Sequence, residues 1–270
     1  MTSRHGTNKR TFALLLAAHG ERKDGAINVG VARLAAVLRS RAIAHEVGIG
    51  FIKSAPSIAE TARALRADEI VVYPLFLSDG YFTRMRLPEM LNTASLADRR
   101  RPIHMLPPLG LDPGLVLVLI DRLMETAQAR GLAAARTGVI LLAHGSSKDP
   151  ASHIATARIA AEVGRRTSFR AVRTALLEEP PSLREAASDL SGPIIIFGLF
   201  AGEGMHGGGD APQLVEDLGR SDTVFAGTIA QLDGIADVVA TAVARAIEGE
   251  KRGLRGGGGP WVALLPLLRR

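Results

Sequence analysis

Short apolar runs alternate along this chain with longer segments in which apolar residues recur every three or four positions. A short apolar run bounded by turn residues predicts a buried strand, and the longer spacing predicts an amphipathic helix. Alternating strands and helices are typical of a parallel sheet with helices on both faces, so the predicted fold class is α/β. The expected strands are 12–18, 47–53, 70–77, 102–107, 138–143, 171–177, 193–200 and 222–228, and the expected helices are 28–40, 57–66, 86–92, 113–129, 151–165, 182–190, 210–218 and 232–248.

The pattern also repeats. ALLLAAHG at residues 13–20 returns as GVILLAHG at 138–145, and the segments 51–58 and 74–88 have counterparts later in the chain, in the same order. Three collinear matches predict two copies of one domain of about 125 residues. A glycine run near the end of the chain is typical of a flexible linker. The predicted divisions are an N-terminal copy over 11–130, a C-terminal copy over 137–249 and a flexible Gly-rich tail over 250–270.

Composition narrows the chemistry and the partners. The chain has no cysteine, which excludes disulfides, thiolate zinc sites, cysteine-ligated iron–sulfur clusters and a cysteine nucleophile. Its net charge of +6 suits an anionic partner, but scattered basic residues and only 4% aromatic residues argue against nucleic acid. No apolar run approaches the ~18 residues of a membrane span. The apolar start at 12–18 resembles a signal peptide, yet its twin lies in mid-chain, so we expect a strand there and a cytoplasmic protein.

Polar residues with metal-binding and proton-transfer chemistry follow the strands of the second copy. His144 follows its first strand, Glu178 its second, and His206 lies shortly after its third. Ligands of open parallel sheets bind beyond the carboxyl ends of the strands, so these three side chains should share one rim. Two imidazoles and a carboxylate suit a divalent metal such as Fe²⁺, Co²⁺, Ni²⁺ or Zn²⁺, and imidazole also transfers protons near neutral pH.

The first copy serves as an internal control for this trio. Its matching residues are His19, Lys53 and Phe82, so only the first imidazole is kept. A trio that stabilised the fold would be expected in both copies, whereas a chemical trio is needed once if the copies share a cleft. We infer that the second copy carries the chemistry. His19 either faces the same cleft as a third imidazole or is a structural remnant.

Three motifs together resemble those of the sirohydrochlorin chelatases, class II chelatases that insert Co²⁺ or Fe²⁺, and in one relative Ni²⁺, into a tetrapyrrole. They are HG after the first strand, EPPS after the second and GxHxxxDxP after the third. The resemblance is to the long form and covers roughly residues 11–248. It implies two tandem chelatase-like domains, each a small parallel sheet flanked by helices, with a cleft between them. It also implies that His144 and His206 bind metal and accept protons, with Glu178 assisting.

The resemblance further implies the reaction and its partners. The expected activity is insertion of Co²⁺ first, or Fe²⁺ second, into sirohydrochlorin in cobalamin or sirohaem biosynthesis. The metal would be a substrate, with no permanently bound cofactor. The tetrapyrrole would be the partner of either a monomer with an internal pseudo-dimer or a homodimer. The alternative is a non-catalytic carrier of metal or tetrapyrrole on the same fold. Predicted contacts to the carboxylate arms of the substrate are Arg84, Arg86, Lys148 and Ser146.

Overall fold

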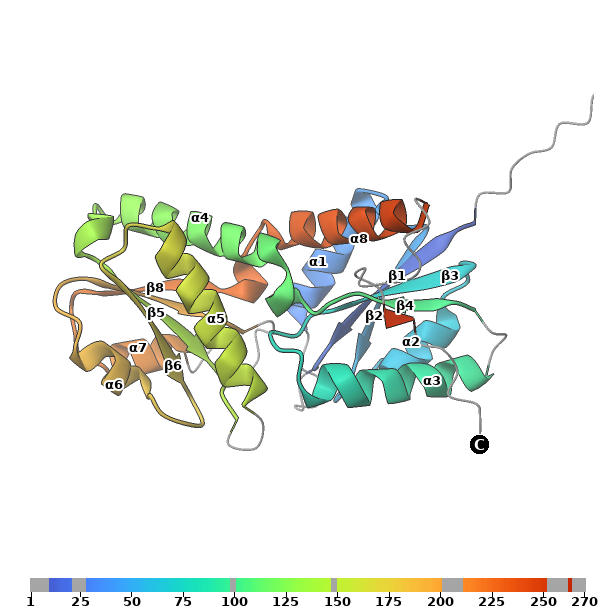
Figure 1. Ribbon diagram of the computed structural model, residues 1–270, viewed down its shortest axis with the longest axis horizontal. Coiled ribbons are helices and arrows are strands. Elements are labelled where there is room, and N and C mark those ends of the chain that lie inside the picture. Colours follow the sequence, from blue (N-terminus) through green and yellow to red (C-terminus); the bar gives the residue numbers. More distant parts are fainter. Residues whose placement is uncertain are drawn as a thin grey trace, which may run out of the picture.

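A computed structural model describes residues 10–20, 28–97, 101–146, 150–200, 211–251 and 262–263. Each copy has a sheet of four parallel strands flanked by helices, which confirms the predicted α/β class (Figure 1), and the first sheet carries a short fifth strand, β9 (Val262–Ala263), antiparallel at its edge. The strand orders are β2-β1-β3-β4 and β6-β5-β7-β8, so the two copies have the same topology. The strands are β1 (Phe12–Ala18), β2 (Glu46–Phe51), β3 (Glu69–Pro74), β4 (Ile103–Met105), β5 (Gly138–Ala143), β6 (Ala171–Leu176), β7 (Ile194–Gly198) and β8 (Thr223–Thr228).

The predicted helices are present, with ends that shift by a few residues. The largest difference concerns the expected helix at 86–92, because a π-helical turn, Phe82–Arg86, precedes α3 and joins it without a break. The described connections contain the short 3₁₀ turns η2 (Leu109–Leu111), η3 (Ala134–Arg136) and η5 (Ile229–Gln231). The α-helices are α1 (Val29–Ser40), α2 (Ile58–Ala64), α3 (Leu87–Ala97), α4 (Pro113–Ala129), α5 (Ala151–Arg166), α6 (Leu183–Ser188), α7 (Ala211–Glu216) and α8 (Ile235–Lys251).

The central strands β1 and β5 are buried on both faces, which explains their continuous apolar sequence. Successive side chains of a strand point to opposite faces of the sheet. In β1, Leu15 packs in a cluster with α2 and α3, whereas Leu16 packs in a cluster with α1, α4 and α8. In β5, Leu142 faces α6 and α7, and Leu141 lies in the same large cluster as Leu16. One hydrophobic core therefore runs through both copies.

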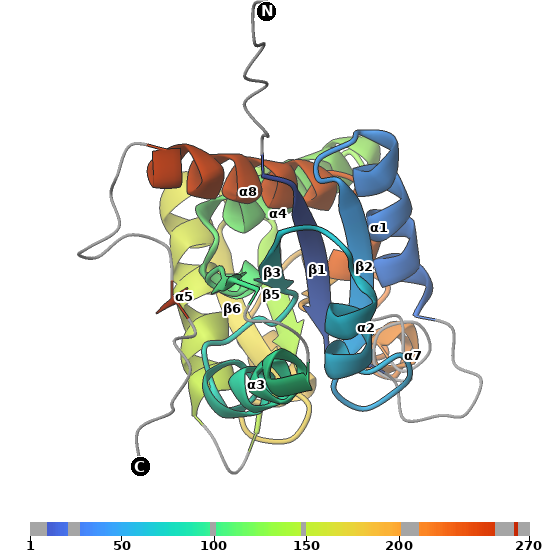
Figure 2. The same cartoon turned by 90° about the vertical axis from the view of Figure 1, so that its right-hand side faces the viewer.

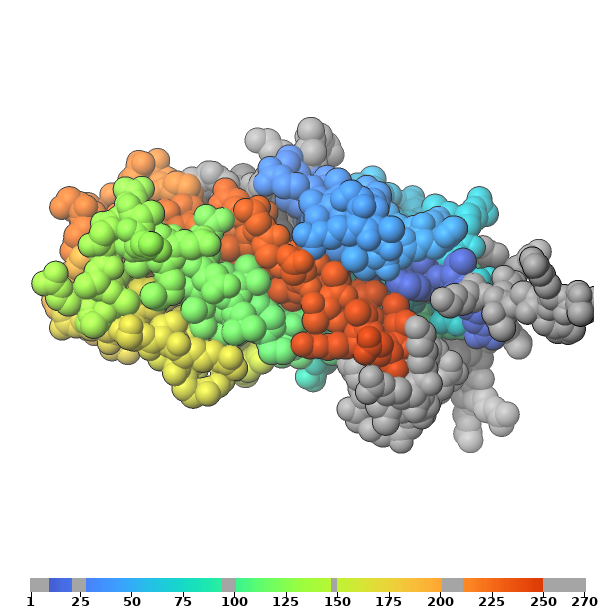
Figure 3. Space-filling view, turned by 90° about the horizontal axis from the view of Figure 1, so that it is seen from above, coloured from blue at the N-terminus to red at the C-terminus, as the bar shows by residue number. Residues whose placement is uncertain are grey.

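The last helix of each copy packs against the other copy. Helix α4 of the first copy contacts β7 and β8, and α8 of the second copy contacts α1. Figure 3 shows α5, α4, α8 and α1 side by side on one face, and Figure 2 looks onto the first copy with α8 in front of α4. Arg41 of the first copy and Asp237 of α8 form an ion pair of 2.6 Å. This exchange of helices ties the copies together.

The carboxyl ends of the two sheets border the same interface. The turn η2, which follows β4, contacts α5, and Gly110 O accepts a hydrogen bond from Arg158. The matching turn η5, which follows β8, contacts α1, where a Cβ on Gly30 would lie 2.9 Å from Ala230 Cβ. Because these contacts are reciprocal, the copies are related by an approximate two-fold axis. The strand ends at which ligands bind in such sheets thus lie close to the junction.

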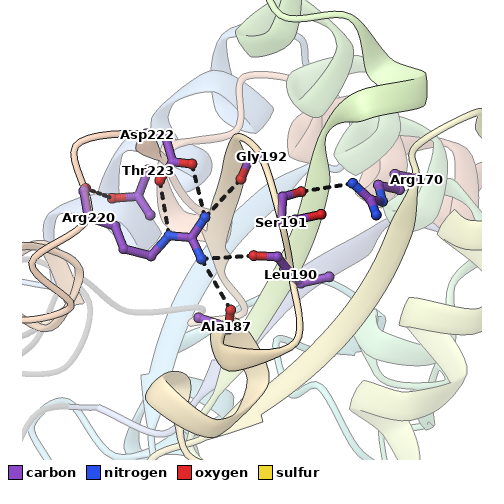
Figure 4. Close-up of polar contacts among 8 residues, drawn as sticks. All are labelled: Arg170, Ala187, Leu190, Ser191, Gly192, Arg220, Asp222 and Thr223. Atoms are coloured by element: carbon purple, nitrogen blue, oxygen red, sulfur yellow. Dashed lines mark hydrogen bonds and ion pairs between the residues drawn. The ribbon is translucent and has the colours of Figure 1, made fainter.

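In each copy, the guanidinium group of an arginine from a later segment donates hydrogen bonds to carbonyl groups at the end of the short second helix. Arg220 and Arg101 each donate to three main-chain carbonyl oxygens, and Figure 4 shows the Arg220 group. Arg220 also donates to the Asp222 carboxylate at 2.9 and 3.0 Å, which lowers the pKa of that carboxyl. The carbonyl acceptors are Ala187, Leu190 and Gly192 for Arg220, and Ala62, Leu65 and Ala67 for Arg101.

The hydrogen bonds of Arg220 should contribute measurably to the stability of the fold. We expect Arg220→Ala to lower the free energy of unfolding by about 2 kcal/mol, since three carbonyl groups lose their donor. The control is Arg170→Ala, because Arg170 makes a single exposed bond of 3.1 Å to Ser191 O nearby; it should cost less than about 0.5 kcal/mol. Urea unfolding followed by circular dichroism measures both. An equal decrease in the free energy of unfolding for the two variants would show that the Arg220 hydrogen bonds do not stabilise the fold.

Part of the predicted tail packs on the first sheet. Val262–Ala263 of the expected flexible tail forms β9, which pairs antiparallel with β4, so this piece of the tail docks on the first sheet. The other residues after 251 lie outside the described part of the chain.

Among the described residues, the helices are too short or too polar to cross a membrane.

Candidate active site

His144 and Glu178 meet at the carboxyl end of the second sheet. The distance from His144 Nδ1 to Glu178 Oε1 is 3.5 Å. Both side chains are about half exposed, at 46% and 54%, so an ion or a ring can reach them from solvent. The structure thus brings together two of the three residues that the strand ends predicted, although they are far apart in the sequence.

The backbone around the pair explains this proximity. β5 and β6 are neighbours and run parallel, so their carboxyl ends lie side by side. Glu178 N–H donates to His144 O at 3.0 Å, which fixes the two residues against each other. Leu176 N–H donates to Pro181 O at 2.8 Å and closes the turn after β6. Each residue of the pair therefore has a defined main-chain position.

A capping box ends this turn and begins the next helix. Glu185 accepts from the backbone N–H of Ser182 at 2.7 Å, and the Ser182 hydroxyl accepts from Glu185 N–H at 3.3 Å. The hydrogen bonds from Ser182 lower the pKa of the Glu185 carboxyl. Ser57 and Glu60 form the same box at the start of α2. The two copies thus present the loop after their second strand in the same way.

The first copy has the same backbone and different chemistry. Lys53 N–H donates to His19 O at 2.9 Å, so Lys53 occupies the position that Glu178 occupies in the second copy. Phe82 stands edge-on to His19, with ring centroids 4.8 Å apart. Phe82 also stacks with Phe76 at 6.4 Å and contacts Tyr81 at 5.6 Å. The imidazole of His19 thus lies beside an aromatic cluster, where the second copy has a carboxylate beside its imidazole.

Two predicted site residues, His206 and Lys148, lie outside the described part of the chain. Within the described residues, His, Asp and Glu nowhere gather in a group of three that could hold a metal ion. His144 and Glu178 alone supply two donors. Their role with His206 at a metal stays a prediction.

Two of the predicted substrate contacts, Arg84 and Arg86, lie on the π-helical turn that leads into α3. Each has a carboxylate partner: Arg84 pairs with Asp79 at 3.0 Å, and Arg86 pairs with Glu89 at 2.7 Å. If either guanidinium binds a substrate carboxylate, it must do so while it also pairs with its own carboxylate partner, or it must leave that partner.

Sequence reasoning missed a second histidine–glutamate contact beside the first. Glu179 Oε1 accepts a hydrogen bond of 2.9 Å from the backbone N–H of Ser146, and Glu179 Oε2 lies 4.0 Å from His153 Nδ1. The backbone donor of Ser146 is therefore engaged within the protein, so a contact from Ser146 to substrate would come from its hydroxyl. The signal in the sequence was the EPPS motif, whose glutamate is Glu179, whereas we assigned a role only to the preceding Glu178.

Comparison with known proteins identifies the family. The profile of the CbiX family matches residues 13–126 and, a second time, residues 138–248. A curated relative from Halobacterium salinarum, named as a probable sirohydrochlorin cobaltochelatase, is 25% identical over 221 residues, which span 74% of this chain and 75% of the relative.

Solved structures agree with this match. A structure described as CbiX, the terminal enzyme for biosynthesis of sirohaem in denitrifying bacteria, has a TM-score of 0.70 and 27% identity and covers 87% of this chain and 99% of that one. SirB from Bacillus subtilis subspecies spizizenii, in complex with cobalt, has a TM-score of 0.71 and covers 90% of this chain and 97% of its own; at 18% identity it shows the fold alone. Fold and repeat define a two-domain metal chelatase. The chain belongs to the CbiX family, which confirms the resemblance seen in the motifs.

Proposed function

We propose that this protein inserts a divalent metal ion into sirohydrochlorin, with Co²⁺ as the preferred ion. The observation that carries the proposal is the contact between His144 and Glu178, 3.5 Å apart at a strand end in the second copy, where the first copy has His19 and Lys53. Membership of the CbiX family supports the class of reaction. A cytoplasmic location stays a prediction from the sequence.

The chemistry requires the two functions that this residue set can supply. Insertion of M²⁺ forms bonds from the metal to the ring nitrogens and breaks two pyrrole N–H bonds, so two protons leave the ring. A neutral imidazole binds a divalent ion and also accepts a proton near neutral pH. We assign metal binding and proton acceptance to His144 and His206. Glu178 assists, because a carboxylate close by favours the bound cation.

The choice of metal follows from the relatives and from the donor atoms. The Halobacterium relative is named a cobaltochelatase, and Co²⁺ binds nitrogen and oxygen donors more tightly than Fe²⁺ does. The CbiX structure is described as part of sirohaem biosynthesis, which supports Fe²⁺ as the second ion. We therefore rank Co²⁺ before Fe²⁺ and treat the ion as a substrate rather than a resident cofactor.

The substrate is an anion, and the protein carries a net charge of +6. We propose that the ring lies between the copies, where the carboxyl ends of both sheets border the junction. Arg84, Arg86, Lys148 and Ser146 are the proposed contacts to its carboxylate arms. Because one chain supplies both copies, a monomer would suffice, and a homodimer is the other arrangement compatible with the fold.

An absorption assay tests the proposal. Purified protein is mixed with sirohydrochlorin and Co²⁺, Fe²⁺ under anaerobic conditions, or Ni²⁺, and the ring spectrum is followed against a protein-free blank. We expect the protein to speed up insertion of Co²⁺ most, because the imidazole and carboxylate donors bind this ion and take up the ring protons. If none of the three ions is inserted faster than in the blank, the proposed activity is wrong.

A further inference from the structure

Two neighbouring glutamates of the second copy have different surroundings. The Glu178 side chain is 54% exposed and faces His144. The Glu179 side chain is only 22% exposed and faces the turn that follows His144. Since the two residues are adjacent in sequence, their different burial indicates different tasks. The reaction proposed above gives Glu178 a task and leaves Glu179 without one.

Glu179 holds the turn from its inner side. Its Oε1 accepts from Ser146 N–H at 2.9 Å. Gly145, between His144 and Ser146, has φ +74, and a Cβ there would lie 3.0 Å from the same oxygen. The carbonyl of His144 is fixed independently by Glu178 N–H at 3.0 Å. The carbonyl of His144 and the N–H of Ser146 are therefore both bonded to the loop that follows β6.

The first copy shows what the turn looks like without this carboxylate. Gly20 has φ +79, and Lys53 N–H donates to His19 O, so the backbone is the same. Ser54 stands at the position of Glu179, and its hydroxyl is buried without a hydrogen bond to any residue in the described part of the chain. Asn28 stands at the position of His153. The glutamate that accepts from the turn and the histidine beside it thus occur only in the copy that has the His144–Glu178 contact.

We infer that Glu179 is a positioning residue: its carboxylate anchors the His144–Ser146 turn so that the imidazole of His144 stays beside Glu178. A charge-assisted hydrogen bond from a backbone N–H to a carboxylate oxygen is among the stronger bonds of this kind. Groups that hydrogen-bond to a metal ligand, or to the chain next to it, generally fix the orientation of that ligand. The proposed metal ligand His144 would be oriented by Glu179 in this way. This inference rests on the proposed function for its effect on rate, but the anchor itself can be observed without turnover.

The test uses the whole 270-residue chain, with three substitutions of Glu179 and one control substitution in the first copy. Glu179→Gln keeps an oxygen that can accept from Ser146 N–H, whereas Glu179→Ala removes it and Glu179→Ser installs the residue of the first copy. We expect Glu179→Ala and Glu179→Ser to lower kcat for Co²⁺ insertion about tenfold, with KM for sirohydrochlorin changed less than about twofold, because only Ser146 among the four proposed substrate contacts lies in this turn. Glu179→Gln should retain at least about half of kcat. Ser54→Ala in the first copy is the matched control and should leave the rate unchanged.

A second measurement separates the anchor from the activity. Amide hydrogen exchange at Ser146 should be faster in Glu179→Ala than in the wild type, and close to wild type in Glu179→Gln, with thermal unfolding confirming that each variant is folded. If the wild type proves inactive, the proposed function fails and exchange alone decides the anchor. Wild-type kcat or unchanged exchange in Glu179→Ala would overturn the inference. So would equal losses of kcat in Glu179→Gln and Glu179→Ala, since the charge rather than the hydrogen bond would then matter.

Discussion

His144→Ala and His206→Ala should each lower kcat for metal insertion by about 100-fold or more. Each variant removes an imidazole that we assign to both metal binding and proton acceptance, and proton transfer by a positioned side chain alone is worth about 100-fold to 10,000-fold. His144 lies 3.5 Å from Glu178, so its loss also removes the neighbour of that carboxylate. Initial rates of Co²⁺ insertion, measured from the sirohydrochlorin spectrum, give the comparison.

The repeat supplies the matched control, His19→Ala. His19 has the same backbone position in the first copy, but Lys53 occupies the sequence position of Glu178, and the ring beside His19 is that of Phe82. We expect this variant to lose less than about tenfold in kcat. Comparable losses in His19→Ala and His144→Ala would contradict the assignment of the chemistry to the second copy. They would favour a site that uses both histidines.

Replacement of Glu178 should have the second large effect, and the substituent should decide its size. Glu178→Gln keeps the shape and removes the charge, so we expect kcat to fall about tenfold to 100-fold. Glu178→Lys installs the residue of the first copy and places a cation beside the metal site, so it should fall further. The contact with His144 involves two half-exposed side chains, and folding should tolerate both changes. Rates and thermal unfolding midpoints check the two statements separately.

The control for Glu178 is Lys53→Gln, which changes the charge at the matching position of the first copy. It should change the rate less than about threefold. If Glu178→Lys were as active as the wild type, the carboxylate would have no role in the reaction. If both positions mattered equally, the asymmetry between the copies would be without functional meaning.

The fold could be predicted from the sequence because its signals are local. Continuous apolar runs such as 138–143 are typical of strands buried on both faces, and β5 covers those residues. Three collinear matches, the first of which contains the His-Gly turn, predicted that the chain holds two related copies. The rule that ligands bind at the carboxyl ends of parallel strands then placed His144 near Glu178, and the structure has them in contact.

Packing between distant segments could not be predicted in the same way. The apolar faces of α4 and α8 predict that these helices are buried, but they do not say which copy they pack against. In the structure, α4 of the first copy packs against the second copy, and α8 of the second copy packs against the first. The partners of Arg84 and Arg86 depend on a π-helical turn that carries no sequence signal we could use. The role of Glu179 was hidden because its partner is a backbone N–H, which any residue at position 146 other than proline would supply.

Turnover number tests the central claim most directly. With sirohydrochlorin and Co²⁺ in large excess over protein, the account predicts that each chain forms many molecules of cobalt-loaded ring, at a rate well above the protein-free blank. His206→Ala should fall close to that blank. Formation of at most one loaded ring per chain by the wild type would contradict the account, because it would describe a carrier of metal or tetrapyrrole rather than an enzyme.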